Sequence, residues 1–226
     1  MNFTFYGHAC FSVEVAEKKL LFDPFITPNE LAKNININDI QADYILISHG
    51  HADHIADAVQ LALHTGACVV CSWEVYEWLT KQGLTNMRHM NTGGRWQQEW
   101  GSIKCTVAQH SSGLPDGTYG GNPMGFIIET KDGSFYYSGD TALTLDMKLI
   151  GEHHKIDCAI MPVGDNFTMG YEDALIASDF VNCNNIIGVH FDTFGYIVID
   201  HAQATSAFEH KGKTLRLPVI GETILM

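Results

Sequence analysis

The sequence predicts an α/β protein in which two mixed β-sheets lie between helices. Three observations support this class. Short apolar runs typical of buried strands alternate with stretches of helical periodicity along most of the chain. The chain has 226 residues, 46% of them hydrophobic, which is enough to bury a sizeable core. No linker, low-complexity tract or internal repeat interrupts the alternation, so we expect one domain over residues 1–226.

The first half of the chain is expected to begin with a meander of three strands, at 2–6, 10–16 and 18–23. A loop rich in Asn follows, and strands and helices then take turns. These elements are a strand at 44–48, a helix at 54–64, a strand at 67–72 and a helix at 73–82.

The second half is expected to open with strands rather than helices. A hairpin turned at 131–133 joins two of these strands. The expected elements are strands at 103–110, 124–130, 134–140 and 158–163, a helix near 171–183, a strand at 186–190, a helix near 201–211 and a last strand around 213–217.

The charge balance argues against polyanionic partners. The chain has 13 Lys and Arg against 26 Asp and Glu, and its formal net charge is -13. Nucleic acid would be repelled over most of such a surface. The N-terminal residues alternate as in a strand and contain no basic leader, and no apolar run approaches the length of a membrane span. We therefore expect a soluble cytoplasmic protein without nucleic-acid or membrane partners.

The six cysteines lie scattered through apolar runs of a chain without a secretory signal. This placement favours reduced thiols over a disulfide framework. Cys68 and Cys71 form a CxxC pair, but the pair lies inside the apolar run ACVVC. A redox role for these two residues is not expected.

The stretch ISHGHADH at 47–54 gathers four polar side chains directly after an apolar strand. Imidazole nitrogens and carboxylates are the ligands that zinc and similar divalent metals accept. His49 and His51 are spaced to reach one metal, and Asp53 and His54 to reach a neighbouring position. The alternative is a helix cap formed by Asp53 with solvated histidines, but four such residues at this density favour a metal site.

Three later strands also end in a single potential ligand. His110 ends IKCTVAQH, Asp140 ends SFYYSGD and His190 ends IIGVH. Each residue alone is more often a core histidine or a turn aspartate, whereas the recurrence of the pattern predicts one shared site. Seven ligands are enough for two metals.

These residues resemble the metallo-β-lactamase superfamily, whose HxHxDH motif matches His49, His51, Asp53 and His54. Further segments make the chain similar to a branch of small bacterial metal-dependent hydrolases that resemble ascorbate-phosphate lactonases. They are GHACF at 7–11, LLFDPF at 20–25, HSSG at 110–113, SGDTAL at 138–143, GDNFTMG at 164–170 and HFDTF at 190–194. The resemblance covers almost the entire chain.

The resemblance implies a four-layer αββα sandwich with a dinuclear metal site at one edge. His49, His51 and His110 would hold the first ion, Asp53, His54 and His190 the second, and Asp140 would bridge them. A hydroxide held between the metals would attack a small ester, lactone or phosphoester, with Asp53 and Asp140 as the catalytic carboxylates. Zinc suits the histidine-rich set best, while manganese, iron and nickel remain open.

Roles around the ligands are less defined by the sequence. Asp23 is equally well explained as a hydrogen-bond partner of a metal-bound histidine or as a turn residue before Pro24, and Asp165 is similar. His8 is more often a surface or core histidine than a residue facing the site. No role is assigned to His64, His89, His153, His154, His201 or His210. The glycine-rich loop at 111–123 either shapes a substrate pocket or serves tight turns alone.

Two other functions fit the same resemblance. An iron-dependent redox enzyme similar to sulfur dioxygenases would keep the histidine motif, so ligand identity alone does not exclude it. A nuclease would need a basic surface, which a charge of -13 argues against. We therefore expect a metal-dependent hydrolase of a small-molecule substrate, and self-association into a homo-oligomer, frequent among proteins of this fold, stays open.

Overall fold

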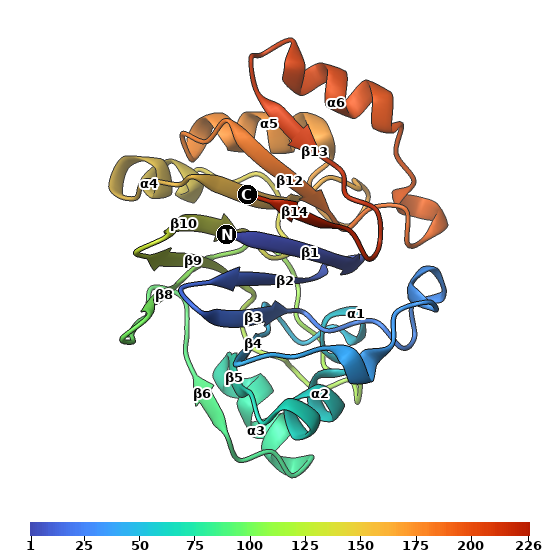
Figure 1. Ribbon diagram of the computed structural model, residues 1–226, viewed down its shortest axis with the longest axis vertical. Coiled ribbons are helices and arrows are strands. Elements are labelled where there is room, and N and C mark those ends of the chain that lie inside the picture. Colours follow the sequence, from blue (N-terminus) through green and yellow to red (C-terminus); the bar gives the residue numbers. More distant parts are fainter.

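The computed structural model describes residues 1–226 and contains two seven-stranded β-sheets packed face to face (Figure 1). The first sheet has the order β14-β1-β2-β3-β4-β5-β6 and the second the order β13-β12-β11-β10-β9-β8-β7. The strands of the first sheet are β1 (Asn2–Gly7), β2 (Cys10–Val15), β3 (Lys18–Phe22), β4 (Tyr44–Leu46), β5 (Cys68–Cys71), β6 (Met87–His89) and β14 (Thr223–Leu225). Those of the second are β7 (Arg95–Gln97), β8 (Gly101–Val107), β9 (Met124–Thr130), β10 (Gly133–Tyr137), β11 (Cys158–Pro162), β12 (Asn185–Val189) and β13 (Thr214–Arg216).

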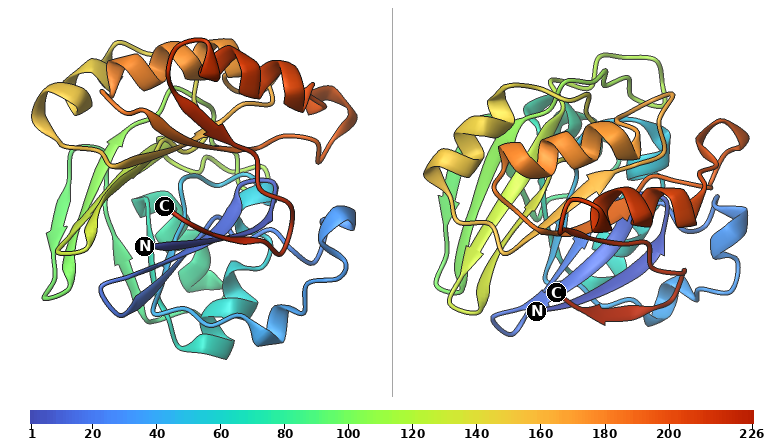
Figure 2. Two further views of the ribbon diagram at one scale, coloured as in Figure 1. Left: turned by 45° about the horizontal axis from the view of Figure 1, so that its top comes forward. Right: turned by 90° about the horizontal axis from the view of Figure 1, so that it is seen from above.

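Helices cover both outer faces and complete four layers (Figure 2). The first sheet carries α2 (Ala58–Thr65) and α3 (Trp73–Lys81), and the second carries α4 (Asp146–His153), α5 (Tyr171–Phe180) and α6 (His201–Glu209). The short helix α1 (Ala52–Ile55) lies at one edge of the sandwich. The expectation of an αββα sandwich with two mixed sheets is therefore confirmed.

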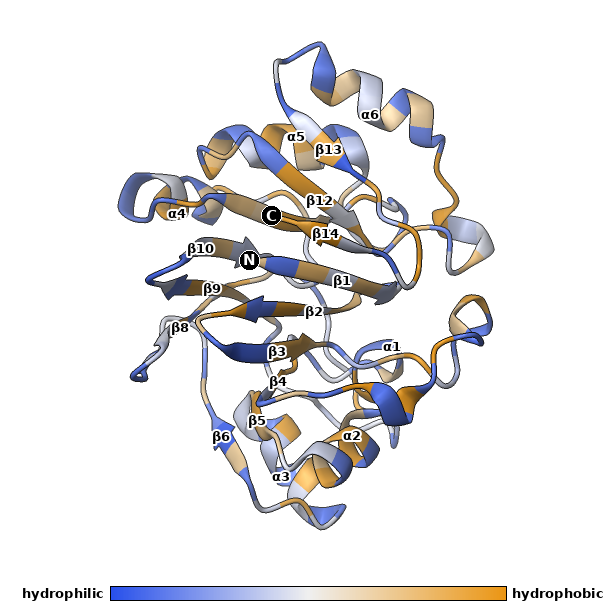
Figure 3. Cartoon of the chain, viewed as in Figure 1, coloured by the Kyte–Doolittle hydropathy of each residue, from blue (hydrophilic) through white to orange (hydrophobic).

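Two apolar clusters hold the layers together. The larger one has 39 buried residues and lies between the sheets and beneath α4 to α6, where Phe11 and Phe22 of the first sheet contact Tyr137 of the second with ring centroids 5.0 and 5.5 Å apart. The smaller one has 18 buried residues and joins the first sheet to α2 and α3. Hydrophobic and hydrophilic residues alternate along α3 and α6 (Figure 3), as expected of helices with one face on a sheet.

The helix expected at 54–64 is interrupted, and the reason lies in Asp57. Its carboxylate accepts hydrogen bonds from the backbone N–H groups of Ile26 and Thr27, at 2.6 and 2.8 Å. Its own N–H donates to the carbonyl of Pro24. These contacts hold Asp57 outside helical geometry, so α1 ends at Ile55 and α2 begins at Ala58.

Several elements were not predicted from the sequence. They are the short strands β6, β7 and β14, the helix α4 and the 3-10 turns η1 (Glu30–Ala32), η2 (Ile37–Asp39) and η3 (Gly195–Ile197). In α4 only Met147 and Ile150 are buried, which is too weak a pattern to detect. The predicted hairpin turn at 131–133 is a residue shorter, because Gly133 already pairs with Thr130.

The sheet topology gathers strand ends at one edge. In the first sheet β3, β4, β5 and β6 run parallel, and in the second β10 to β13 run parallel. Carboxyl ends of parallel strands meet at the same edge, where α/β proteins place their sites. None of the helices combines the length and the apolar character needed to cross a lipid bilayer.

Candidate metal centre

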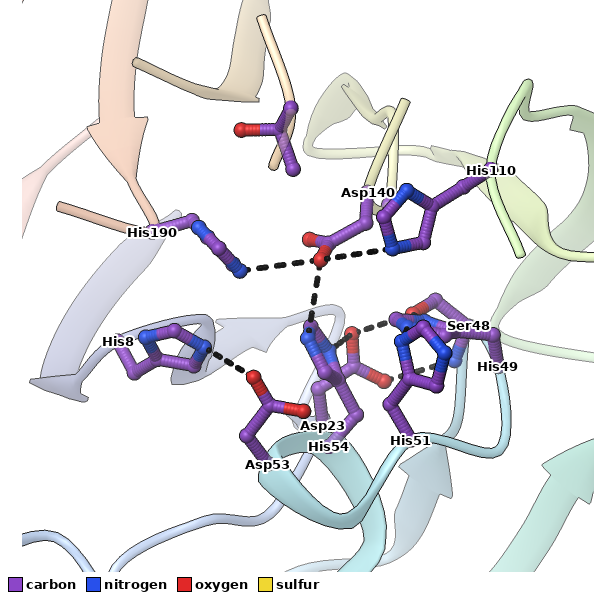
Figure 4. Close-up of polar contacts among 12 residues, drawn as sticks. His8, Asp23, Ser48, His49, His51, Asp53, His54, His110, Asp140 and His190 are labelled. Carbon is purple, nitrogen blue, oxygen red and sulfur yellow. Dashed lines mark hydrogen bonds and ion pairs between the residues drawn. The ribbon is translucent and has the colours of Figure 1, made fainter. Parts of the chain in front are cut away.

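All seven predicted ligands converge at the edge where β4, β8, β10 and β12 end (Figure 4). The histidine-rich segment follows β4, and His190 directly follows β12. His110 and Asp140 lie three residues beyond the ends of β8 and β10. The two sheets therefore contribute ligands from opposite sides, and neither sheet carries the complete set.

The backbone before Asp140 requires a glycine. Gly139 has a φ of 62°, and a Cβ atom there would lie 2.7 Å from the carbonyl oxygen of Met124. Only glycine adopts this conformation without strain and permits this approach. Gly139 thus turns the chain out of β10, so that the Asp140 side chain enters the cluster.

The first group of ligands contains His49, His51 and His110, whose nitrogens lie within 4.8 Å of one another. His49 Nε2 and His51 Nδ1 are 2.9 Å apart. Two nitrogens on one zinc ion are about 3.3 Å apart, given Zn–N bonds of about 2.0 Å and a tetrahedral angle. Burial lowers the pKa of all three rings, so each keeps a free lone pair at neutral pH. The group fits one divalent cation.

The second group contains Asp53, His54 and His190, together with His8. His190 and His8 both have left-handed backbones, with φ of 56° and 57°, and the His190 N–H donates to the His8 carbonyl at 2.7 Å. Such conformations cost free energy in residues other than glycine, and they concentrate at functional sites. Here they aim both rings at Asp53 and Asp140.

Asp140 lies between the two groups. Its Oδ2 is 3.2 Å from His54 Nε2, 3.0 Å from His190 Nε2 and 3.7 Å from His110 Nε2 (Figure 4). Burial would raise the pKa of this carboxyl, but the charges of His190 and His54 outweigh it and hold the pKa well below the usual range. Asp140 therefore stays ionised between the two groups.

The surroundings of His54 show whether the residues fit a metal. Its ring is fully buried, and its Nε2 makes no properly aligned hydrogen bond although it points at Asp140. Burial would lower the pKa of His54, but the charges of Asp140 and Asp23 raise it well above the usual value. The surroundings thus favour positive charge at this ring, and a buried, unpaired nitrogen beside carboxylates suits a bound cation.

Asp23 contacts the ring of His54 directly and that of His49 through Ser48. Of its two open roles, the hydrogen-bond partner is therefore the one that the structure supports. Its Oδ2 accepts from His54 Nδ1 at 2.9 Å, from Tyr137 Oη at 2.6 Å and from Ser48 Oγ at 2.6 Å. Ser48 Oγ in turn contacts His49 Nδ1 at 2.9 Å. When both Nδ1 atoms carry a proton, His54 and His49 present Nε2 lone pairs to a metal.

His8 does face the site, contrary to the more frequent alternative. It is 1% exposed, and its Nε2 lies 3.1 Å from Asp53 Oδ2. Burial and the charge of His190 lower the pKa of His8 to about 4, so the neutral ring donates its Nε2–H to the carboxylate. Burial would raise the pKa of Asp53, but this hydrogen bond and the charge of His54 lower it. Position 8 in a GHACF strand turn was the only sequence signal for this contact.

The remaining candidates lie outside the cluster. Asp165 is exposed, has a left-handed backbone with φ of 61° and forms backbone hydrogen bonds with Phe167 and Met169, so of its two open roles the turn residue is the one that fits. None of the six histidines left without a role belongs to a group that could hold a metal. All six cysteines are free, as expected.

A cleft of about 940 Å³ opens onto the cluster. Its floor contains His51, Asp53, His110, Asp140 and His190. Its wall comes from two loops, after β11 and after β12, that carry Phe167, Phe194 and Tyr196. The glycine-rich loop at 111–123 contributes only Ser111, so of its two open roles the structure favours tight turns over a pocket wall. The aromatic residues were missed because isolated aromatics in loops carry no pattern.

An αββα sandwich with histidines and aspartates gathered at one edge defines the metallo-β-lactamase class of metalloproteins. A family model described as "Beta-lactamase superfamily domain" matches residues 2–190. A protein of Flavobacterium johnsoniae named UPF0173 metal-dependent hydrolase is 51% identical over 224 residues, covering 99% of both chains. The chain therefore belongs to the beta-lactamase superfamily and, within it, to the UPF0173 metal-dependent hydrolases. The predicted enzyme class is confirmed at the level of this family.

Solved structures agree with this membership. Igni18, a novel metallo hydrolase from the archaeon Ignicoccus hospitalis, has a TM-score of 0.89 at 32% identity, covering 99% of this chain and 97% of its own. An isothiocyanate hydrolase from Delia radicum gut bacteria has a TM-score of 0.81, covering 100% of this chain and 99% of its own. At 20% identity, the second likeness shows the fold alone.

Proposed function

We propose that this protein is a cytoplasmic hydrolase that uses two divalent cations, most suitably zinc, to cleave a small ester, lactone or phosphoester. The observation that carries the proposal is the position of Asp140. One carboxylate oxygen lies within 3.7 Å of Nε2 atoms that belong to both histidine groups. Five histidines and two carboxylates form the ligand set, and such a set suits zinc.

The residues divide between two ions. His49, His51 and His110 would hold the first ion and Asp53, His54 and His190 the second, with Asp140 between them. Two such cations supply a Lewis acid and make a hydroxide nucleophile available near neutral pH. His8, Asp53 and Asp23 would direct this chemistry.

The protein groups orient and protect the reacting atoms. His8 fixes Asp53 through Oδ2, which would leave Oδ1 available as a hydrogen-bond acceptor for the nucleophile. Asp23 keeps His54 in the tautomer that offers Nε2. On the floor of the cleft Asp140 is only 3% exposed, and its neighbour His54 is 0% exposed, and a carboxylate acts more strongly in such a buried setting than in water.

Metal analysis of the purified protein tests the proposal. Protein prepared without added metal or chelator is compared by mass spectrometry with an Asp140→Ala variant. We expect about two zinc ions per chain in the parent and a clear fall in the variant, with hydrolysis of esters or phosphoesters falling in parallel. Iron in place of zinc, with no hydrolysis, would favour the redox alternative. A parent chain that takes up no metal would refute the proposal.

A further inference from the structure

The cleft beside the metal centre carries no Lys or Arg among the twelve residues that line it. The only charged groups in the lining besides histidines are the carboxylates of Asp53 and Asp140. Sites that hold phosphate or carboxylate groups of a ligand normally supply Arg or Lys for charge-assisted hydrogen bonds. This cleft has nothing to pair with a charge remote from the reacting bond.

Lys and Arg are also absent from most of the chain segments that form the cleft. No Lys or Arg occurs between Lys33 and Lys81, between Lys104 and Lys131, or between Lys155 and Lys211. All the lining residues except Asp140 fall within these three intervals. With a net charge of -13, the surrounding surface would further disfavour the approach of an anion.

The wall of the cleft is aromatic instead. Phe167, Phe194 and Tyr196 are 48%, 38% and 79% exposed, which is unusual for rings gathered in one place. The rings of Phe167 and Tyr196 meet edge to face with centroids 6.2 Å apart. The ring of Phe194 packs edge to face against the ring of His8, with centroids 5.2 Å apart. The aromatic wall is therefore organised before any ligand arrives.

Covering these rings would stabilise a complex. Apolar surface removed from water contributes about 25 cal/mol per Å², and aromatic partners add geometric preference. Asn166 and Thr193 lie among the rings and offer hydrogen bonds to an uncharged carbonyl or ether oxygen. A cleft of about 940 Å³ with this lining suits a small molecule with an apolar body.

We infer that the substrate is an uncharged carboxylic ester or lactone whose body carries an aromatic or branched aliphatic group. The inference rests on the proposed function and narrows it. Hydrolysis would break the acyl C–O bond, and water would supply a hydroxyl group to the acyl carbon and a proton to the leaving oxygen. The body of the substrate would lie against Phe167, Phe194 and Tyr196, with its carbonyl over the ligand cluster.

Matched ester substrates test the charge preference. We compare para-nitrophenyl butanoate with mono-para-nitrophenyl succinate, in which a carboxylate replaces the terminal methyl group, and subtract the hydrolysis of each ester without protein, because the succinate carboxylate attacks its own ester. The zinc-loaded protein should favour the butanoate in kcat/KM by at least about tenfold, or 1.4 kcal/mol. The double variant Phe167→Ala/Tyr196→Ala should raise KM for the butanoate about tenfold, with kcat changed less. Leu63→Ala serves as the control because Leu63 is exposed on α2 and does not line the cleft.

A lysine introduced into the aromatic wall should reverse the charge preference. Phe167→Lys should improve the succinate ester relative to the butanoate by at least about fivefold, because the wall then offers a partner for its carboxylate. A parent protein that cleaves the succinate ester as well as the butanoate overturns the inference while leaving the proposed hydrolase intact.

Binding separates the inference from the proposed function. The stable amides para-nitrophenyl butanamide and para-nitrophenyl succinamic acid are titrated by saturation-transfer NMR. Preferential binding of the uncharged amide, lost in the double variant, supports recognition of an uncharged, apolar ligand by the cleft even if no ester is cleaved, and in that case only the hydrolysis of the ester fails. Equal binding of the two amides, or tighter binding of the acid, overturns the inference.

Discussion

Asp23 and Asp57 are two buried aspartates. Comparing their variants distinguishes support of the metal centre from support of the fold. Both accept hydrogen bonds from backbone N–H groups, Asp23 from Ser48 and Asp57 from Ile26 and Thr27. Only Asp23 also contacts a ring nitrogen of a ligand, His54 Nδ1. Similar burial, at 0% and 4% exposure, makes them a matched pair.

The substitutions Asp23→Asn and Asp57→Asn should each destabilise the protein by about 1.5–3 kcal/mol, because each removes a charged acceptor of buried hydrogen bonds. Only Asp23→Asn should also weaken zinc binding, by about 10- to 100-fold. Urea denaturation and zinc titration against a chelating dye measure the two effects. Equal zinc affinity in the two variants would show that Asp23 supports the fold alone.

His8 is expected to act as a positioning residue for Asp53. Removing its hydrogen bond in His8→Ala should lower the affinity for the second zinc ion by about 10- to 100-fold, because the carboxylate loses the donor that orients it. The first proposed ion, assigned to His49, His51 and His110, should bind as before. A two-step zinc titration resolves the ions.

Two further variants sharpen this expectation. His8→Gln keeps an N–H donor and should restore much of the affinity if His8 positions Asp53. A glutamine that fails to rescue would indicate instead that His8 binds the ion itself, since His8 Nε2 lies within reach of the same group. His153→Gln is the control because His153 is exposed and remote from the ligand groups.

At the scale of elements, β10 places two fully buried tyrosines on opposite faces of its sheet. Tyr137 faces the other sheet, where it contacts Phe11 and Phe22 and donates to Asp23 at 2.6 Å. Tyr136 points the other way, and its hydroxyl, although it lies near Thr106, makes no properly aligned hydrogen bond. Alternation along one strand thus joins the core to the metal centre at Tyr137 alone.

Tyr137→Phe should cost about 1.5–3 kcal/mol of unfolding free energy, because Asp23 would lose a donor to its buried charge. Tyr136→Phe should change stability little or increase it slightly, because it removes a buried hydroxyl without a partner. Chemical denaturation of the two variants side by side checks this difference. Equal losses would mean that packing, and not the contact with Asp23, determines the effect at Tyr137.

The elements that the sequence predicted are those with a strong local signal. Strands such as β9 and β11 are continuous apolar runs bounded by polar residues, and α3 has a Ser72 cap and clear periodicity. The edge strand β14 has three residues, and its contacts lie outside its own segment, with β1 through strand pairing and with Arg216 through a hydrogen bond to the Leu225 carbonyl. The break at Asp57 depends on a loop about 30 residues away. Local patterns do not contain such long-range causes.

The residues of the candidate site also divide into those that local sequence patterns predict and those that they do not. The convergence of the seven candidate ligands was predictable because four of them crowd the segment after one apolar strand and the other three follow three further strands, where polar metal-binding side chains need a reason. His8 and Tyr137 were not, since their roles depend on contacts with residues 45 and 114 positions away. The aromatic wall depends on how two separate loops fold over the cleft. Such residues become visible only when the chain is assembled.

At the scale of the whole molecule, bound metal would connect the two sheets. His49, His51, Asp53 and His54 follow β4 of the first sheet, while His110, Asp140 and His190 follow strands of the second. Each proposed ion would therefore take ligands from both sheets. Since the unfolded chain holds no preformed site, metal binding adds to the free energy of folding.

Chelation should consequently lower the melting temperature of the whole protein. Free zinc at 1,000 times its Kd stabilises the folded state by about 4 kcal/mol per ion, and each kcal/mol corresponds to about 2–4 °C for a chain of this size. Differential scanning calorimetry of zinc-loaded and chelator-treated protein should show one cooperative transition that moves down by about 8 °C or more. The Asp140→Ala variant should show a much smaller difference between the two conditions, because it lacks the proposed bridge between the ions. A parent protein whose transition does not move on chelation would show that the ligands do not join the sheets through metal, since linkage requires any ion bound to the folded state to stabilise it.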